Sequence, residues 1–111
     1  MEFEELSQAV QDELLALATL LGELGPRLSR PHADTLNNSS FANMKELRFE
    51  ADGGVWRVAF AFDPDRRAIL LVAGDKSGVS EKRFYKTLIA KADKRYQAHL
   101  DRRTAAKQEK K

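Results

Sequence analysis

Two tight-turn signals divide the middle of this chain into three strand-like segments. Three short segments rich in branched and aromatic residues, at 44–50, 55–62 and 68–74, are separated by Ala-Asp-Gly-Gly at 51–54 and by a turn that starts with Asp-Pro-Asp at 63–65. The first turn is a hairpin signal, and the second has proline in its favoured second position. Strands joined by such short loops run antiparallel. The sequence therefore predicts a three-stranded antiparallel sheet.

A helix is predicted before this sheet. In residues 1–24, six apolar side chains recur at spacings of three and four, which places them on one helical face: Leu6, Val10, Leu14, Leu17, Leu21 and Leu24. Ser7 can cap a fresh helix after a short first turn, so the region is one helix or a helical hairpin. Gly25-Pro26 ends it, because Gly suits a left-handed cap and Pro cannot continue a helix. Residues 27–43 follow as a long connection.

A second long helix is predicted from about residue 80 into the high 100s. Its contact stripe repeats every four residues: Phe84, Leu88, Ala92, Tyr96 and Leu100. Residues 101–111 offer no apolar partner for burial, so we expect this basic tail to fray. A chain of 111 residues supports one hydrophobic core but not two, so residues 1–111 are predicted to form a single α+β domain.

Symmetric closure of the two hairpins fixes the strand register. It predicts the cross-strand pairs Glu50–Val55, Arg48–Arg57, Phe49–Trp56, Leu47–Val58, Phe60–Leu70 and Val58–Val72. One sheet face then carries eight apolar side chains that we expect to pack against the first helix: Leu47, Phe49, Trp56, Val58, Phe60, Phe62, Leu70 and Val72. The other face is divided, and its apolar end should lie beneath the second helix: Ala59, Ala61, Ile69 and Leu71.

The remaining end of that face is predicted to be cationic. Arg48 and Arg57 are directly opposed, which costs stability unless an anion lies between them. The third strand places Ala73 beside Arg57, so the following loop brings Lys76 close to both arginines. Two arginines and a lysine in one patch suit a bound phosphate group.

A purely structural network is the alternative interpretation of this patch. Glu46 and Asp75 lie close enough in the predicted register to neutralise the arginines. Charged clusters with perturbed protonation occur in structural networks as well as in functional sites.

The charge distribution favours a polyanionic partner for the second half of the chain. The net charge is only +2, but residues 1–24 hold six acids and no base, whereas residues 76–111 hold twelve Lys or Arg and four acids. Within that basic half, Lys82 and Arg83 are candidate nucleic-acid contacts. A solvated basic helix is the alternative.

Composition argues against several classes of protein. There is no cysteine, and His32 and His99 lie far apart, so we expect neither a metal site nor a cofactor. No apolar run approaches the roughly 20 residues needed to cross a bilayer, and the acidic N-terminus does not resemble a secretory signal. A cytoplasmic protein without membrane contact is therefore predicted.

Five strings of this chain occur together in one known pattern: RPHADTL at 30–36, ANMKELRF at 42–49, WRVAFAFDP at 56–64, ILLVAGDKSG at 69–78 and RFYKTLIAKADKRYQAHL at 83–100. In this combination the chain resembles the RelE/ParE superfamily of toxins from type II toxin–antitoxin systems, and within it the phage-derived HigB-like branch. The resemblance covers nearly the whole chain. The family usually begins with a short strand ahead of its first helix, whereas this chain starts inside what resembles that helix; we expect either a truncated start or an absent strand.

The resemblance implies an activity, partners and site residues. It implies ribosome-dependent cleavage of mRNA without a metal, and neutralisation by a helix-turn-helix antitoxin similar to HigA. Matched position by position, the family's basic set falls on Lys45 and Arg48 in the Lys-x-x-Arg motif, on Arg57 and on Lys76. Some relatives use a tyrosine, for which Tyr85 is the main candidate and Tyr96 a weaker one; both tyrosines can instead be core residues.

RNA cleavage without a metal needs a base for the 2′-hydroxyl proton, cations for the charge on phosphorus and an acid for the leaving oxygen. Arg48 and Arg57 suit the electrostatic role. Lys76 or Lys45 suits proton transfer, because neighbouring cations lower the pKa of a lysine. Strict alternation, however, sends Lys45 to the apolar face. We expect His99 to be exposed near the end of the second helix.

Two other functions remain open from the sequence. A ParE-like relative with the same fold acts on DNA gyrase, so the fold alone does not decide the function. A non-catalytic nucleic-acid-binding module that uses the basic helix is the second alternative, and it predicts salt-sensitive binding without cleavage.

Overall fold

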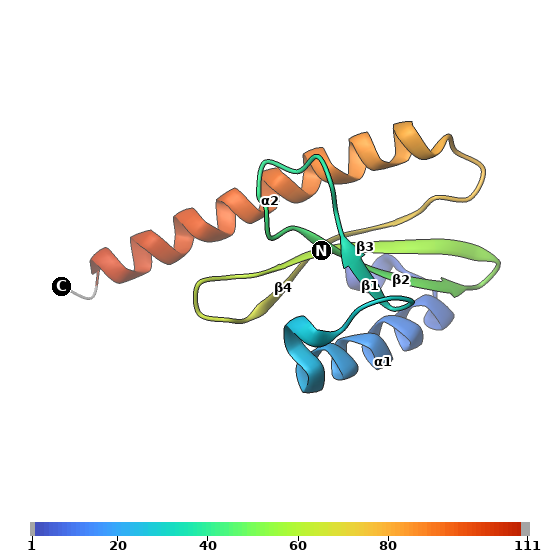
Figure 1. The fold of residues 1–111 in the computed structure, drawn as a ribbon, viewed down its shortest axis with the longest axis horizontal. Coiled ribbons are helices and arrows are strands. Elements are labelled where there is room, and N and C mark those ends of the chain that lie inside the picture. Colours follow the sequence, from blue (N-terminus) through green and yellow to red (C-terminus); the bar gives the residue numbers. More distant parts are fainter. Residues whose placement is uncertain (1, 110–111) are drawn as a thin grey trace.

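The computed structural model describes residues 2–109 as two long helices on either side of one antiparallel sheet (Figure 1). In chain order the elements are η1 Phe3–Glu5, α1 Gln8–Leu24, η2 Gly25–Arg27, β1 Ala33–Thr35, β2 Lys45–Ala51, β3 Gly54–Phe62, β4 Ala68–Asp75 and α2 Glu81–Glu109. The strand order in the sheet is β1-β2-β3-β4, with every neighbouring pair antiparallel. The α+β class and both predicted helices are confirmed.

The predicted start and end of the first helix are both confirmed. The Ser7 side chain accepts a hydrogen bond from the Val10 amide, so α1 begins after a separate short turn, η1. Gly25 ends α1 with a positive φ of 56°, a conformation that glycine adopts at little cost. The buried stripe of α1 packs on one sheet face, as predicted, against Leu47, Phe49, Val58 and Phe60.

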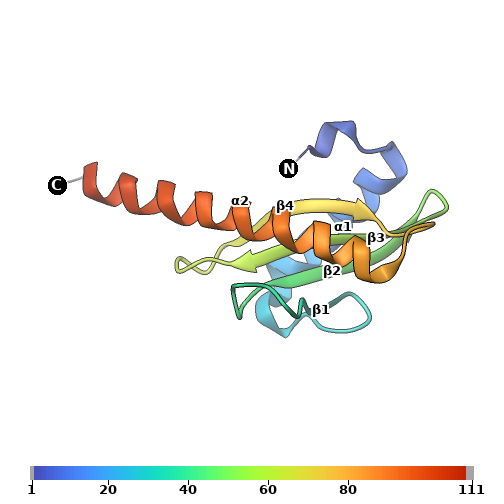
Figure 2. The ribbon, with the colours of Figure 1, turned by 90° about the horizontal axis from the view of Figure 1, so that it is seen from above.

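The sheet has four strands, so the predicted number of three was wrong. The extra strand, β1, lies inside the segment predicted as a connection, and it pairs Ala33 with Leu47 and Thr35 with Lys45. Figure 2 shows β1 at the edge of the sheet next to β2. A three-residue strand with the sequence Ala-Asp-Thr has too few residues for an alternating pattern to reveal it.

The first hairpin closes in the predicted register. Asp52 and Gly53 both have positive φ, at 52° and 73°, which is the two-residue turn that best fits the twist of paired strands. Arg48 therefore lies opposite Arg57, and Phe49 lies opposite Trp56.

The second hairpin contains a register shift that the sequence did not reveal. Phe60 pairs with Leu70 as predicted, but Ala59 pairs with Val72, which leaves Leu71 as an extra residue in β4. Val58 consequently faces Ala73 instead of Val72. Val72 moves to the α2 side of the sheet, where it packs in the second core cluster.

This shift also changes the residue beside Arg57. Gly74, and not Ala73, lies opposite Arg57, while Ala73 packs against the α1 side. A Cβ atom on Gly74 would lie 2.9 Å from the ring of Phe84, closer than packed carbon atoms approach. Glycine at this position therefore lets the first turn of α2 approach the sheet.

Helix α2 packs through the predicted stripe on the second sheet face. Leu88, Ala92 and Tyr96 are buried against Ala59, Ala61 and Leu71, with Phe84 and Leu100 partly buried at the ends. The helix continues beyond Leu100 to Glu109, past the end of the sheet (Figure 1), where we expected fraying. Arg103 pairs with Asp65 in this extension, with 2.7 Å between Nε and Oδ2. Residues 110 and 111 of the predicted tail lie outside the described part of the chain.

His99 is only partly exposed, contrary to the expected exposure, and it binds the buried carboxylate of Asp63 in a contact that we call the anchor. Its Nε2 lies 2.9 Å from Oδ2 of Asp63, a carboxylate at the end of β3 that is 5% exposed. The other carboxylate oxygen accepts hydrogen bonds from the amides of Asp65 and Arg67, which closes the turn begun at Asp63-Pro64. The contact between Asp63 and His99 was not predicted from the sequence, because it joins residues 36 positions apart.

Within residues 2–109, no helix combines the length and the hydropathy that crossing a membrane requires.

Candidate functional site

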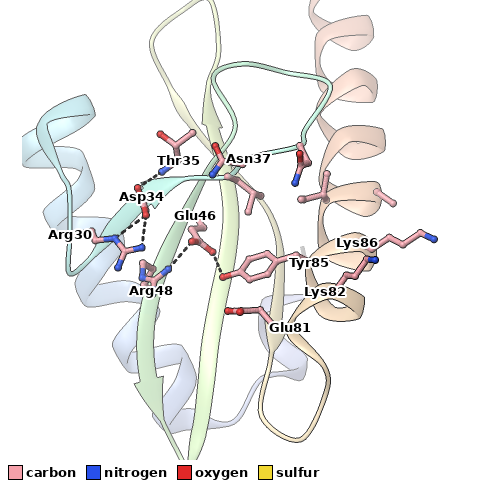
Figure 3. Close-up of a pocket in the computed structure, with 14 residues that line it drawn as sticks. Arg30, Asp34, Thr35, Asn37, Glu46, Arg48, Glu81, Lys82, Tyr85 and Lys86 are labelled. Carbon is pink, nitrogen blue, oxygen red and sulfur yellow. Dashed lines mark hydrogen bonds and ion pairs between the residues drawn. The ribbon is translucent and has the colours of Figure 1, made fainter.

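A groove of about 810 Å³ runs between the β1–β2 edge of the sheet and the first turns of α2 (Figure 3). Arg30 and Asp34 line it from the β1 side, and Glu46 and Arg48 line its floor from β2. The wall formed by α2 contributes Glu81, Lys82, Tyr85 and Lys86. We call this the α2 groove.

Glu46 lies at the centre of the polar side chains on the groove floor. It is 4% exposed, and its Oε2 accepts a hydrogen bond of 2.8 Å from Nη1 of Arg48. Its Oε1 accepts a hydrogen bond of 2.8 Å from the Tyr85 hydroxyl and lies 3.7 Å from Nε of Arg57. Figure 3 shows Glu46 between Arg48 and Tyr85. One carboxylate thus explains how the two opposed arginines are tolerated.

Arg57 is brought to the site but is buried within it. It is 6% exposed, its Nε donates to the Tyr85 hydroxyl at 3.2 Å, and its Nη1 donates to the carbonyl of Trp56 at 2.9 Å. The side chain of Arg48 is 21% exposed and lines the groove. Of the two opposed arginines, Arg48 is therefore the one that a ligand in the groove can reach directly.

Tyr85 joins the groove floor to the loop after β4. Lys76 lies over the Tyr85 ring, with its Nζ 5.9 Å from the ring centre, and forms an ion pair of 2.9 Å with Glu81. Burial raises the pKa of the Tyr85 hydroxyl, and the hydrogen bond to Glu46 raises this pKa further. Tyr85 is consequently protonated at neutral pH and acts as a hydrogen-bond donor.

The predicted site residues divide into two groups. Arg48, Arg57 and Tyr85 come together around Glu46, Lys76 lies over the ring of Tyr85, and Lys82 lines the groove. Lys45 alternates with Glu46 along β2, which places it on the α1 side of the sheet, away from the groove. Arg83 lines a different cavity, on the other side of α2.

The structural alternative considered from the sequence holds for one of its two acids. Glu46 does pair with the arginines, as described above. Asp75 instead accepts hydrogen bonds from the amide of Val55 and from both the amide and the hydroxyl of Ser77, so it fastens the loop after β4 to the start of β3. These bonds, led by those from Ser77, hold the pKa of Asp75 below its ordinary value.

The groove also contains residues that the sequence did not single out. Lys86 lies one helical turn after Lys82, and neither lysine forms an ion pair with a residue that the structure describes. Arg30 pairs with Asp34 at 2.8 Å on the opposite wall. The four-residue spacing of Lys82 and Lys86 on one helix was the available signal for the second lysine. Across residues 2–109, no three His, Asp or Glu side chains gather where they could hold a metal ion.

The fold and the groove define a small helix–sheet–helix protein with a buried Glu–Arg–Tyr cluster on the floor of its charged groove. The chain belongs to the family described as "Phage derived protein Gp49-like (DUF891)", whose model matches residues 1–97. No solved structure matches the chain significantly.

Two relatives come from Mycobacterium tuberculosis. The chain is 45% identical over 93 residues to a protein named "Putative toxin HigB3", a match that covers 84% of this chain and 79% of the relative. It is 40% identical over 96 residues to "Putative toxin HigB2", and the match covers 86% of this chain and 47% of that longer relative. The predicted resemblance to the HigB-like branch is confirmed.

Proposed function

We propose that this protein is the toxin of a toxin–antitoxin system and that it blocks translation by cleaving mRNA on the ribosome. The family and the names of the two relatives support the first part. The observation that carries the second part is the α2 groove, which is lined by Arg48 on its floor and by Lys82 and Lys86 on its α2 wall. A row of cations along a groove suits the phosphates of a single RNA strand.

The cations support a cleavage that uses the RNA's own nucleophile. The 2′-oxygen attacks the adjacent phosphorus while its proton passes to a base, the bond from phosphorus to the 5′-oxygen breaks, and that oxygen takes up a proton. The products are a 2′,3′-cyclic phosphate and a 5′-hydroxyl. Negative charge grows on the phosphate oxygens during attack, so fixed cations lower the barrier.

Each side chain has a role consistent with its position. Arg48 contacts the phosphate, because its guanidinium is accessible and always charged. Arg57 does not contact the phosphate itself; it orients Tyr85 by donating a hydrogen bond to the Tyr85 hydroxyl. Lys76 lies over the Tyr85 ring and transfers a proton once RNA displaces its partner Glu81.

The test is expression of the chain in growing cells, followed by primer extension on cellular mRNA. The parent chain should stop growth and leave new 5′ ends within coding sequences. Arg48→Ala should reduce cleavage by about 100-fold, the scale expected when one fixed donor to a developing anion is lost. Arg67→Ala is the matched control, because it removes the same charge from an exposed turn at the far end of β3 and should cleave like the parent.

Other outcomes of the same experiment separate the alternatives. Growth arrest with stalled replication and intact mRNA would overturn the nuclease proposal in favour of action on gyrase. Salt-sensitive RNA binding without new 5′ ends would favour a non-catalytic binding module. We further propose that a helix-turn-helix antitoxin neutralises the protein by direct binding; its co-expression should restore growth, and continued arrest in a purified, intact complex would contradict this.

A further inference from the structure

Glu46 has no role in the chemistry proposed above, yet it contacts three other side chains of the site. Its two oxygens bind Arg48 from its own strand and Tyr85 from α2, and lie within ion-pair distance of Arg57 on β3. A carboxylate loses strong hydration when it is buried, so its retention here needs an explanation. Being an acid, it also opposes the binding of an anionic strand.

Stability alone does not explain this carboxylate. A buried ion pair is often no more stable than well-packed apolar residues of similar size, because desolvation offsets the attraction. A network that served only the core would also enclose all of its members. Here Arg48 and Tyr85 both line the α2 groove, so the groups that Glu46 orients face the space where a ligand would lie (Figure 3).

We propose that Glu46 is a positioning residue, which holds the Arg48 guanidinium and the Tyr85 hydroxyl in the orientation needed for reaction at an RNA phosphate in the α2 groove. This inference rests on the proposed function. Glu46 neutralises one of the two opposed arginines, so they remain close together before RNA arrives, and one positive charge is left for the phosphate. Glu46 therefore weakens the binding of RNA in the ground state, and it fixes the orientation of Arg48 and Tyr85.

This role makes binding and turnover respond in opposite directions. Glu46→Gln removes a negative charge from the groove floor, so RNA should bind more tightly. The amide also replaces one acceptor oxygen by an NH₂ group, so Arg48 and Tyr85 cannot both keep their hydrogen bonds. The reacting groups then lose their fixed orientation and the chemical step slows. A residue that mattered only for folding would reduce the active fraction and leave KM unchanged.

The first measurement is cleavage of a defined mRNA on purified ribosomes with the full-length chain. Glu46→Gln should lower KM by about 3-fold and kcat by about 30-fold, because the lost contacts act mainly in the transition state. Glu50→Gln is the matched control: it removes the same charge from the same strand and the same face, four positions further along, at an exposed site. Glu50→Gln should have the KM and kcat of the parent. If Glu50→Gln lowered both constants as much as Glu46→Gln does, the proposal would be overturned.

A conservative variant covers the case in which Glu46→Gln does not fold. Glu46→Asp keeps the charge but withdraws the carboxylate by one methylene group, so it should lower kcat with KM nearly unchanged. Parent values of both constants in folded Glu46→Asp would overturn the positioning role.

The second measurement does not depend on RNA cleavage. Tyr85 ionisation can be followed by ultraviolet absorbance, with Tyr85→Phe used to separate its signal from that of Tyr96. Burial and the hydrogen bond to Glu46 raise the pKa of Tyr85, while Arg57 opposes them, so Glu46→Gln should lower this pKa. Lys76 faces the ring from the loop after β4, and it is unchanged in all variants.

The two measurements distinguish the two possible failures. Suppose that neither the parent nor any variant cleaves RNA, but that the Tyr85 pKa is lower in Glu46→Gln. The proposed function then fails, while Glu46 still positions Tyr85. If the parent cleaves RNA and the Tyr85 pKa and both kinetic constants are unaltered in Glu46→Gln, then the positioning role fails and the proposed function stands.

Discussion

Among the residues whose burial is described, the carboxylates of Glu46 and Asp63 are buried to a similar extent but have different hydrogen-bond partners. Glu46 and Asp63 are 4% and 5% exposed, both lie at the sheet, and each binds one side chain of α2, Tyr85 or His99. Asp63 takes its remaining hydrogen bonds from two backbone amides of its own turn. Glu46 instead faces two arginines that carry more donor groups than one carboxylate can accept.

This difference indicates that Asp63 has a structural role and that Glu46 belongs to the candidate functional site. Around Asp63 the donors and acceptors are matched within the fold, so the cluster fastens the β3–β4 turn to α2 and has nothing left for a ligand. Around Glu46 a surplus of positive charge remains, and the members line a groove. Burial and ion pairing alone would not distinguish the two carboxylates; the balance of charge and the access to a groove do.

The largest expected effect comes from removing the anchor. Asp63→Ala leaves two turn amides and the His99 ring without their acceptor, and should lower the free energy of unfolding by about 3 kcal/mol. Urea denaturation would measure this loss. Cleavage per folded molecule should be unchanged, since Asp63 lies away from the α2 groove. Impaired cleavage by the folded variant would break the distinction between anchor and site.

The stability lost in Asp63→Ala should depend on pH. Burial opposes ionisation of Asp63, but the hydrogen bonds from His99 and from the amides of Arg67 and Asp65 outweigh it and hold its pKa below the ordinary value. A lowered folded-state pKa gives stability that is present above the unfolded pKa, near 3.8, and is lost as the pH falls through the folded pKa. The stability difference between parent and Asp63→Ala should therefore shrink below about pH 4. A constant difference down to pH 2 would contradict this.

Turn chemistry made much of the groove floor predictable from the sequence. The Asp52-Gly53 turn fixes the register of β2 and β3, and this alone places Arg48 opposite Arg57. The register shift at Leu71 was not predictable, because the apolar run Ile-Leu-Leu-Val has no polar residue to mark a face. The burial of Arg57 was also missed, since it depends on how closely α2 brings Tyr85 to the sheet.

A substitution of intermediate effect is expected at Gly74, where the first turn of α2 comes close to the sheet. Gly74→Ala places a Cβ 2.9 Å from the Phe84 ring, so the first turn of α2 must move outward. Overpacking of this kind should cost about 1–2 kcal/mol of stability and weaken the Tyr85–Glu46 hydrogen bond. Thermal unfolding and mRNA cleavage should both be impaired. Gly22→Ala, at a helical position with open space around its Cβ, is the control; normal cleavage by Gly74→Ala would show that the site does not depend on this approach.

The smallest effect is expected at the partly exposed ion pair of Arg103 and Asp65, which extends the anchor. Arg103 donates two hydrogen bonds to Asp65, which lower the pKa of this carboxyl to about 2. Arg103→Ala should return the pKa of Asp65 toward its ordinary value, measured by carboxyl NMR titration, with little change in unfolding because exposed ion pairs contribute little. Arg102→Ala, one position earlier at an exposed site, is the control and should leave the Asp65 pKa low. If Arg103→Ala instead destabilised the fold as much as Asp63→Ala, the anchor would include the extended end of α2, and its stability would not reside in the buried carboxylate alone.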